Sequence, residues 1–99
     1  MENIILYNEL YLCYESLLTE KEKETFLDHF SEDLTLTEIA ENNQISKSAV
    51  HKTVTTVINK LINYESILHI NEKNHLVSQA LEEKDISKIK EILNSYNNL

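Results

Sequence analysis

The fold is decided by the stretch Thr35-Leu-Thr-Glu-Ile-Ala-Glu-Asn-Asn-Gln-Ile-Ser-Lys-Ser-Ala-Val-His-Lys-Thr-Val-Thr-Thr-Val-Ile-Asn-Lys-Leu61. Its first part predicts a short helix, since Thr35 and Glu38 have the spacing of a capping box. The run from 42 to 44, Asn-Asn-Gln, should break that helix, because Asn tolerates the left-handed conformation better than most residues. Ser46 is then a typical N-cap for a longer second helix. The stretch therefore predicts a helix-turn-helix.

The apolar and small residues of this stretch fit two helices that cross at a tight turn. Such helices need a small residue at their crossing, which Ala40 supplies, and apolar residues around the turn. Ile39, Ile45 and Val50 supply the latter. A capped helix pair with an alanine at the crossing also occurs in ordinary helical bundles, so this spacing alone leaves both interpretations open.

The second helix of a helix-turn-helix is the one that enters the DNA major groove, and its first residues contact the DNA. Four polar residues share one face there, opposite Val50 and Val54: Lys47, Ser48, His51 and Lys52. We expect these four to approach base edges or phosphates. Thr35 and Thr37, at the start of the preceding helix, are expected to touch phosphates.

Charge is distributed unevenly along the 99 residues, whose net charge is −8. Residues 1–41 hold 11 acids and two lysines, whereas residues 42–64 hold three lysines and no acid. Exclusion of acids from the predicted recognition helix is what phosphate repulsion would require. Three lysines are a thin footprint for a DNA-binding protein, so we expect weak and very salt-sensitive binding.

The composition excludes several other classes of protein. The chain has no Gly, no Pro and one cysteine, Cys13. Phosphate-binding glycine loops, an internal disulfide and a cysteine-based zinc site are thereby excluded. His69 and His75 are poorly spaced for a shared metal, and no nucleophile with a cleft is evident, so neither a metal, a cofactor nor an enzyme is expected. All nine basic residues are lysines, which suggests an AT-rich, bacterial genome.

The flanking sequence predicts four further helices and an all-α fold. The first runs from about Asn3 to Leu18, with Tyr7, Tyr11 and Tyr14 on its apolar face. The second begins at the capping box of Thr19 and Glu22 and ends near Ser31. The long helix after Ser46 should run to about Ile70, followed by a turn at Asn71 and Asn74. Two more helices follow, one around residues 76–81 and one capped by Asp85.

These helices predict a helix-turn-helix domain over residues 1–70 and a C-terminal helical extension, 71–99, that packs on the same domain. Cys13 is expected to be a buried small hydrophobe, and His29 to lie at the surface. The helix from Ser46 to Ile70 carries more apolar surface than one helix pair can cover, which predicts a homodimer. No apolar run approaches a membrane span and the first residues lack a secretory signal pattern, so a cytoplasmic location is expected.

Several motifs resemble those of known bacterial proteins. Four stretches resemble region 4 of sigma-70 factors: Leu18 to Phe26, Leu34 to Ala40, Ile45 to Val50 and Lys60-Leu61. Over about residues 5–70 the chain resembles more closely the YlxM-like family, through four motifs: Leu17-Leu18-Thr19, Leu36-Thr-Glu-Ile-Ala40, Ser46-x-x-Ala49-Val50 and Tyr64-Glu65-x-x-Leu68-His69. This resemblance implies a sigma-70 region 4-like helix-turn-helix bundle with additional C-terminal helices. It also implies a DNA-binding regulator associated with the signal recognition particle pathway.

The chain departs from the family pattern at two places. The family usually has an aromatic or Leu and then Gly before the Ile/Val-Ser pair, where this chain has Asn43 and Gln44. It also often has basic residues just after the position of Val54, where this chain has Thr55 and Thr56. Two functional hypotheses therefore stand: a regulator that binds double-stranded DNA weakly, and a protein-interaction adaptor or dimerisation module of the secretion pathway whose helix-turn-helix does not bind DNA.

Overall fold

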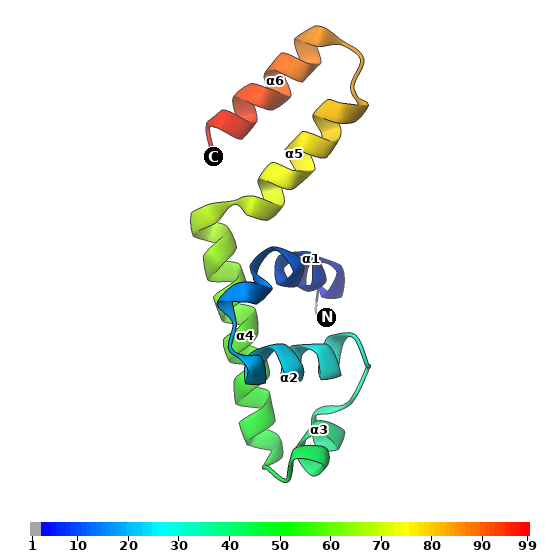
Figure 1. The fold of residues 1–99 in the computed structure, drawn as a ribbon, viewed down its shortest axis with the longest axis vertical. Helices are drawn as coiled ribbons and strands as arrows, with labels where there is room; N and C mark the ends of the chain where they lie inside the picture. The colour runs from blue at the N-terminus through cyan, green and yellow to red at the C-terminus, as the bar shows by residue number, and fades with distance from the viewer. Residues whose placement is uncertain (1–2) are drawn as a thin grey trace. The chain divides into compact units, whose positions relative to one another are not determined.

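The computed structural model describes residues 3–99, and these residues form helices and no strand. The helices are α1 (Ile4–Tyr14), the 3-10 turn η1 (Glu15–Leu17), α2 (Glu20–Phe30), α3 (Leu36–Asn43), α4 (Lys47–Leu68), α5 (Ile70–Glu82) and α6 (Ile86–Asn97) (Figure 1). The predicted all-α helix-turn-helix fold with additional C-terminal helices is confirmed. Met1 and Glu2, with which the expected first domain begins, lie outside the described residues.

The chain forms two compact units, an N-terminal unit (Met1–Tyr64) and a C-terminal unit (Glu65–Leu99). The boundary between them falls inside α4. The expected packing of residues 71–99 on the first domain stays a prediction.

Side chains cap the first two helices as the sequence predicts. The Asn3 side chain accepts a hydrogen bond from the Leu6 amide, 3.2 Å away, and so begins α1. The Thr19 hydroxyl accepts from the Glu22 amide at 3.1 Å, while the Glu22 carboxylate accepts from the Thr19 amide at 2.9 Å. Both bonds satisfy amides that a helix start leaves without partners, so the capping box fixes where α2 begins.

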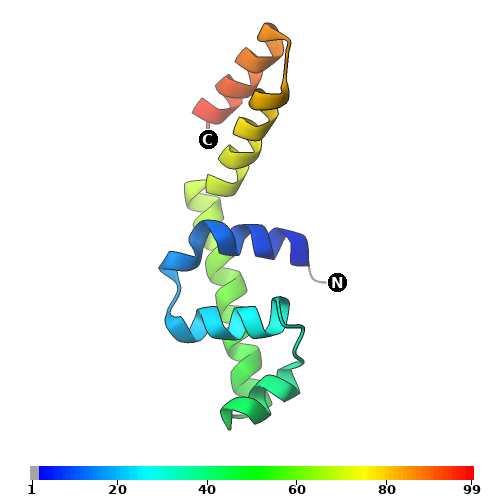
Figure 2. The same cartoon turned by 45° about the vertical axis from the view of Figure 1, so that its right-hand side comes forward.

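The N-terminal unit holds every buried residue of the described part of the chain. In both views α1 and α2 lie side by side across α4 (Figures 1 and 2). Between them is an apolar cluster of seven buried residues: Leu10, Tyr11, Tyr14, Leu18, Phe26, Val57 and Leu61. Tyr11 and Phe26 stack with parallel rings, their centroids 4.5 Å apart. The expected inward face of the first helix is confirmed for Tyr11 and Tyr14, which are buried, while Tyr7 is half-buried.

The long helix ends close to the expected residue, but the turn expected after it, at Asn71 and Asn74, is wrong. α4 ends at Leu68, and His69 takes the left-handed conformation with φ 55°. α5 begins at once, so the expected turn at Asn71 and Asn74 is a helix instead. The cause is a cap supplied from α4, since the Glu65 carboxylate accepts hydrogen bonds from the Asn71 and Glu72 amides, each at 3.0 Å.

The C-terminal unit is a helical hairpin in which α5 and α6 run antiparallel, side by side in both views (Figures 1 and 2). The Asp85 side chain accepts from the Ser87 amide at 2.9 Å, which confirms Asp85 as the N-cap of α6. The Lys73 ammonium lies 5.4 Å from the centre of the Tyr96 ring and links the two helices.

Cys13 and His29 are both only partly buried. Cys13 is half-buried and packs against the cluster around Leu10 rather than inside it. His29 is half-buried, and its Nδ1 lies 2.8 Å from the Leu34 carbonyl oxygen. Within residues 3–99, no helix has both the length and the apolar character that crossing a membrane requires.

Candidate nucleic-acid interface

The turn between α3 and α4 depends on one residue in the left-handed conformation, Gln44, with φ 56° and ψ 43°. The Gln44 amide donates to the Glu41 carbonyl at 3.3 Å and the Ile45 amide to the Ala40 carbonyl at 3.0 Å, as in a Schellman motif. The sequence expectation gave this conformation to asparagine, whereas Asn43 stays helical and donates from its side chain to the Ile39 carbonyl. Glycine takes this conformation most readily, so Gln44 holds strain of about 1 kcal/mol.

Ser46 begins α4, as predicted. Its hydroxyl accepts from the Ala49 amide at 3.1 Å and lies 3.2 Å from the Ser48 hydroxyl. These contacts fix the first turn of α4 relative to the turn that precedes it.

The two helices pack through a small apolar cluster of Ile39, Ala40, Val50 and Val54, all buried. Ala40 contributes no bulk beyond a methyl group, so the α3 backbone can lie close to α4. The small crossing residue and its apolar neighbours are thus where the sequence places them. Ile45, which was also expected to pack around the turn, is instead exposed.

The first turns of α4 expose the four polar residues predicted for the recognition helix. Lys47, Ser48, His51 and Lys52 are all exposed. They lie together on the first turns of α4, behind which the buried Val50 and Val54 anchor the helix. The structure therefore brings these four side chains to one accessible face, and their contact with DNA stays a prediction.

Thr35 and Thr37 lie at the start of α3, at the far end of that helix from the turn. The Thr35 amide donates to the Glu38 carboxylate at 3.0 Å, and the Thr35 hydroxyl accepts from the Glu38 amide at 3.1 Å. Hydrogen bonding to Thr35 lowers the pKa of Glu38. The backbone amide of Thr35 has the larger effect and the Thr35 side chain the smaller one. The Thr35 amide, which a phosphate would need as a donor, thus already donates its hydrogen bond to an anionic carboxylate.

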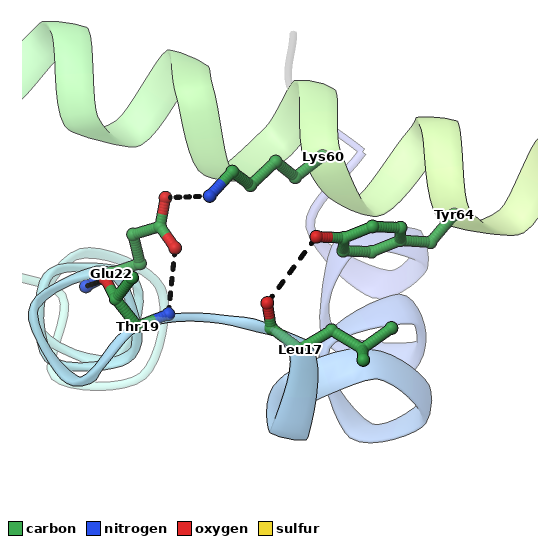
Figure 3. Close-up of polar contacts among 5 residues, drawn as sticks. All are labelled: Leu17, Thr19, Glu22, Lys60 and Tyr64. Atoms are coloured by element: carbon green, nitrogen blue, oxygen red, sulfur yellow. Dashed lines mark hydrogen bonds and ion pairs between the residues drawn. The ribbon is translucent and has the colours of Figure 1, made fainter.

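One lysine of the acid-free segment 42–64, Lys60, forms an ion pair with an acidic residue of α2 (Figure 3). Lys60 Nζ lies 2.7 Å from Glu22 Oε2, while the other carboxylate oxygen accepts from the Thr19 amide. Burial tends to raise the pKa of Glu22, but the hydrogen bonds from Lys60 and Thr19 outweigh it and lower that pKa. The same ion pair raises the pKa of Lys60. Lys47 and Lys52 are therefore the lysines of this segment that stand on the exposed face.

Sequence reasoning missed this ion pair. Glu22 and Lys60 are 38 residues apart, so no local spacing relates them. Tyr64 makes a similar long-range contact, since its hydroxyl donates to the Leu17 carbonyl at 3.4 Å (Figure 3). The two contacts join the 3-10 turn η1 and the start of α2 to α4, the helix that carries the polar face.

Acidic, cysteine and histidine side chains do not gather into a metal site in the part of the chain that the structure describes. No group of three such residues there could hold a metal ion. His69 lies 3.9 Å from the Glu72 carboxylate, its neighbour in the first turn of α5.

The amino-acid sequence of this chain is similar to those of several bacterial proteins. The model of the UPF0122 family, described as "Putative helix-turn-helix protein, YlxM / p13 like", matches residues 1–98. A probable UPF0122 protein of Mycoplasma mycoides is 33% identical over 92% of this chain and 80% of its own length. A UPF0122 protein of Ureaplasma parvum is 46% identical over 66% of each chain. One of Fusobacterium nucleatum is 38% identical over 69% of this chain and 66% of its own.

Proposed function

The chain belongs to the UPF0122 family of YlxM/p13-like helix-turn-helix proteins, and from this premise we propose that it is a bacterial regulatory protein that binds double-stranded DNA. The observation that carries the proposal is the exposed, acid-free face of α4, with Lys47, Ser48, His51 and Lys52 held over a buried apolar seam. A recognition helix needs this combination, because its outer face contacts the groove while its inner face is fixed to the helix before it.

The residues of this face would divide the contacts by their chemistry. Lys47 and Lys52 would neutralise phosphates, while Ser48 and His51 would reach base edges. Thr35 and Thr37 would add hydroxyl contacts to the backbone. Their contribution should be small, since the Glu38 carboxylate lies at the same helix start.

The affinity should be low and strongly dependent on salt. With two lysines, about two phosphates are neutralised, so log K should fall with log salt at a slope of about −2. The net charge of −8 opposes the approach to DNA further.

A charge-reversal experiment tests this proposal. We expect the double substitution Lys47→Glu and Lys52→Glu to abolish binding to a mixed-sequence duplex at low salt, measured by fluorescence anisotropy. Both side chains are exposed, so circular dichroism should show an unchanged fold. The matched control is Lys84→Glu with Lys88→Glu, which changes net charge equally on exposed positions of the C-terminal unit. Wild type without binding at about 25 mM salt, or equal loss in the control, would refute the proposal.

A second candidate is an adaptor of the secretion pathway that uses the helix-turn-helix only as a scaffold. The engaged Lys60 favours it, because that ion pair leaves two lysines on the acid-free face. The resemblance to YlxM-like proteins points to components of the signal recognition particle, in the cytoplasm, as partners. Binding to the particle's protein or RNA that survives Lys47→Glu with Lys52→Glu, in a protein that shows no DNA binding, would support the adaptor.

A further inference from the structure

The C-terminal hairpin has no core of its own. Neither α5 nor α6, both described in full, contains a buried residue. Helices of 13 and 12 residues are marginal in water unless an apolar face is covered. A hairpin of this kind gains stability when further helices pack on it.

The side of each helix that faces its neighbour is marked by half-buried apolar residues. On α5 these are Leu76 and Ala80, and on α6 they are Ile89, Ile92 and Tyr96. They lie three or four positions apart, as one helix face requires.

A second apolar stripe on each helix stays exposed. On α5 it consists of Ile70, Val77 and Leu81, the last 82% exposed, and on α6 of Ile86, 69% exposed, and Leu93. At 100° per residue, each stripe lies about a quarter-turn beyond the inward-facing side, in the direction of increasing residue number. Because the two helices are antiparallel, these rotations bring both stripes to the same face of the hairpin. We call these five residues the hairpin face.

Charge on this face differs from that of the chain as a whole. The same helical geometry places the acids Glu72, Glu82 and Glu91 on the opposite side of the hairpin. Asn74 lies within the α5 stripe, and Lys90 lies at the edge of the α6 stripe. In a protein of net charge −8, the hairpin face is therefore a surface on which two copies can meet without opposing carboxylates.

We propose that the hairpin face is the surface through which two copies of this chain associate, by packing it against the same face of a second copy. The five residues expose on the order of 500 Å², so pairing them would bury on the order of 1,000 Å², the size at which stable interfaces begin. The product is a four-helix arrangement with two-fold symmetry, in which each copy supplies the cover that the other lacks.

This surface differs from the one that the sequence suggested for a homodimer. Within the chain, α4 already buries Val50, Val54, Val57 and Leu61. That helix still exposes Ile62, Ile67 and Leu68, at 47%, 65% and 43%, whereas the hairpin face gathers five exposed apolar residues from two helices. The proposal does not require DNA binding.

Sedimentation equilibrium of the full chain, from about 10 to 500 μM, tests the proposal at the affinities that an interface of this size supports. Wild type should move from the 11.6 kDa monomer to twice that mass. Leu81→Glu with Leu93→Glu should raise the dissociation constant at least about 100-fold, because the interface would enclose unpaired carboxylates. The matched control is Ile5→Glu with Leu12→Glu, two residues of α1 that are 76% and 75% exposed. It should leave association unchanged.

A third variant tests the same surface in the opposite direction. Asn74→Leu should tighten association by about tenfold, because a polar residue within an apolar helix seam lowers stability. Circular dichroism checks that each variant keeps its helices. Four results would overturn the proposal: a wild type that stays monomeric, dimers that survive Leu81→Glu with Leu93→Glu, dimers lost through the α1 variant, or an Asn74→Leu variant with unchanged affinity.

Discussion

The two units of the chain are both built of helices but stabilise them differently. In the N-terminal unit α1, α2 and the first part of α4 enclose large side chains such as Tyr14 and Phe26, both only 1% exposed. In the C-terminal unit α5 and α6 contact each other through half-buried residues alone. Both units have well-capped helix starts, so capping does not distinguish them.

The difference teaches which forces act where. Local hydrogen bonds decide where helices begin, as at Thr35 and Asp85, and each contributes about 1 kcal/mol. Burial decides whether the helices stay together, since burying one large apolar side chain contributes about 1.5 to 3 kcal/mol. The N-terminal unit therefore supports the exposed face of α4 on a buried core, whereas the hairpin face of the C-terminal unit stays exposed.

The largest expected effect contrasts a core residue with a hairpin residue. Phe26→Ala should lower the free energy of unfolding by about 3–5 kcal/mol, because it removes a ring stacked on Tyr11 and leaves a cavity. Ile89→Ala, in α6, should cost about 1 kcal/mol, because that side chain is already half-exposed. Urea denaturation followed by circular dichroism, at low micromolar protein, measures both. Equal losses would show that the hairpin is as well buried as the core.

The next effect concerns the ion pair that ties α2 to α4. Glu22→Gln should lower stability by about 1 kcal/mol at pH 7, a modest loss because the Lys60 side chain is 38% exposed. The folded pKa of Glu22 is lowered from 4.5, so its contribution is complete above about pH 4.5 and is lost as the pH falls through the folded pKa.

The pH dependence separates this ion pair from general acid unfolding. Wild type should lose stability more steeply than Glu22→Gln as the pH falls below about 4.5, measured by thermal unfolding. The control is Glu24→Gln, an exposed position on the same helix, which should follow wild type. If all three proteins lose stability in parallel, the ion pair adds nothing to the fold.

Features that depend on near neighbours in the sequence could be predicted. The caps at Thr19, Thr35, Ser46 and Asp85 follow from side chains that reach amides two or three residues away. Helical periodicity likewise indicates that Val50 and Val54 are buried while residues such as Lys47 stay exposed.

Features that depend on the fold could not be predicted. Lys60 forms an ion pair with Glu22, which lies on another helix. The number of lysines in the α4 sequence is therefore larger than the number of positive charges on its exposed face. The break at His69 requires that the Glu65 side chain turn back to cap α5, which the apolar pattern does not reveal. The left-handed position in the turn falls on Gln44 rather than on an asparagine, because the helix extends through Asn43.

The smallest effect concerns that left-handed residue. Gln44→Gly should raise the free energy of unfolding by about 0.5–1 kcal/mol, because glycine has no Cβ to strain at φ 56°. Gln44→Ala should give no such gain, since alanine keeps the strain. Thermal unfolding followed in the near-ultraviolet, where the tyrosines of the N-terminal core report, measures the change. His69→Gly makes the same replacement in the C-terminal unit, at φ 55°, and should leave this transition in place. If His69→Gly stabilises the tyrosine core as much as Gln44→Gly does, the two units unfold as one and the contrast between them fails.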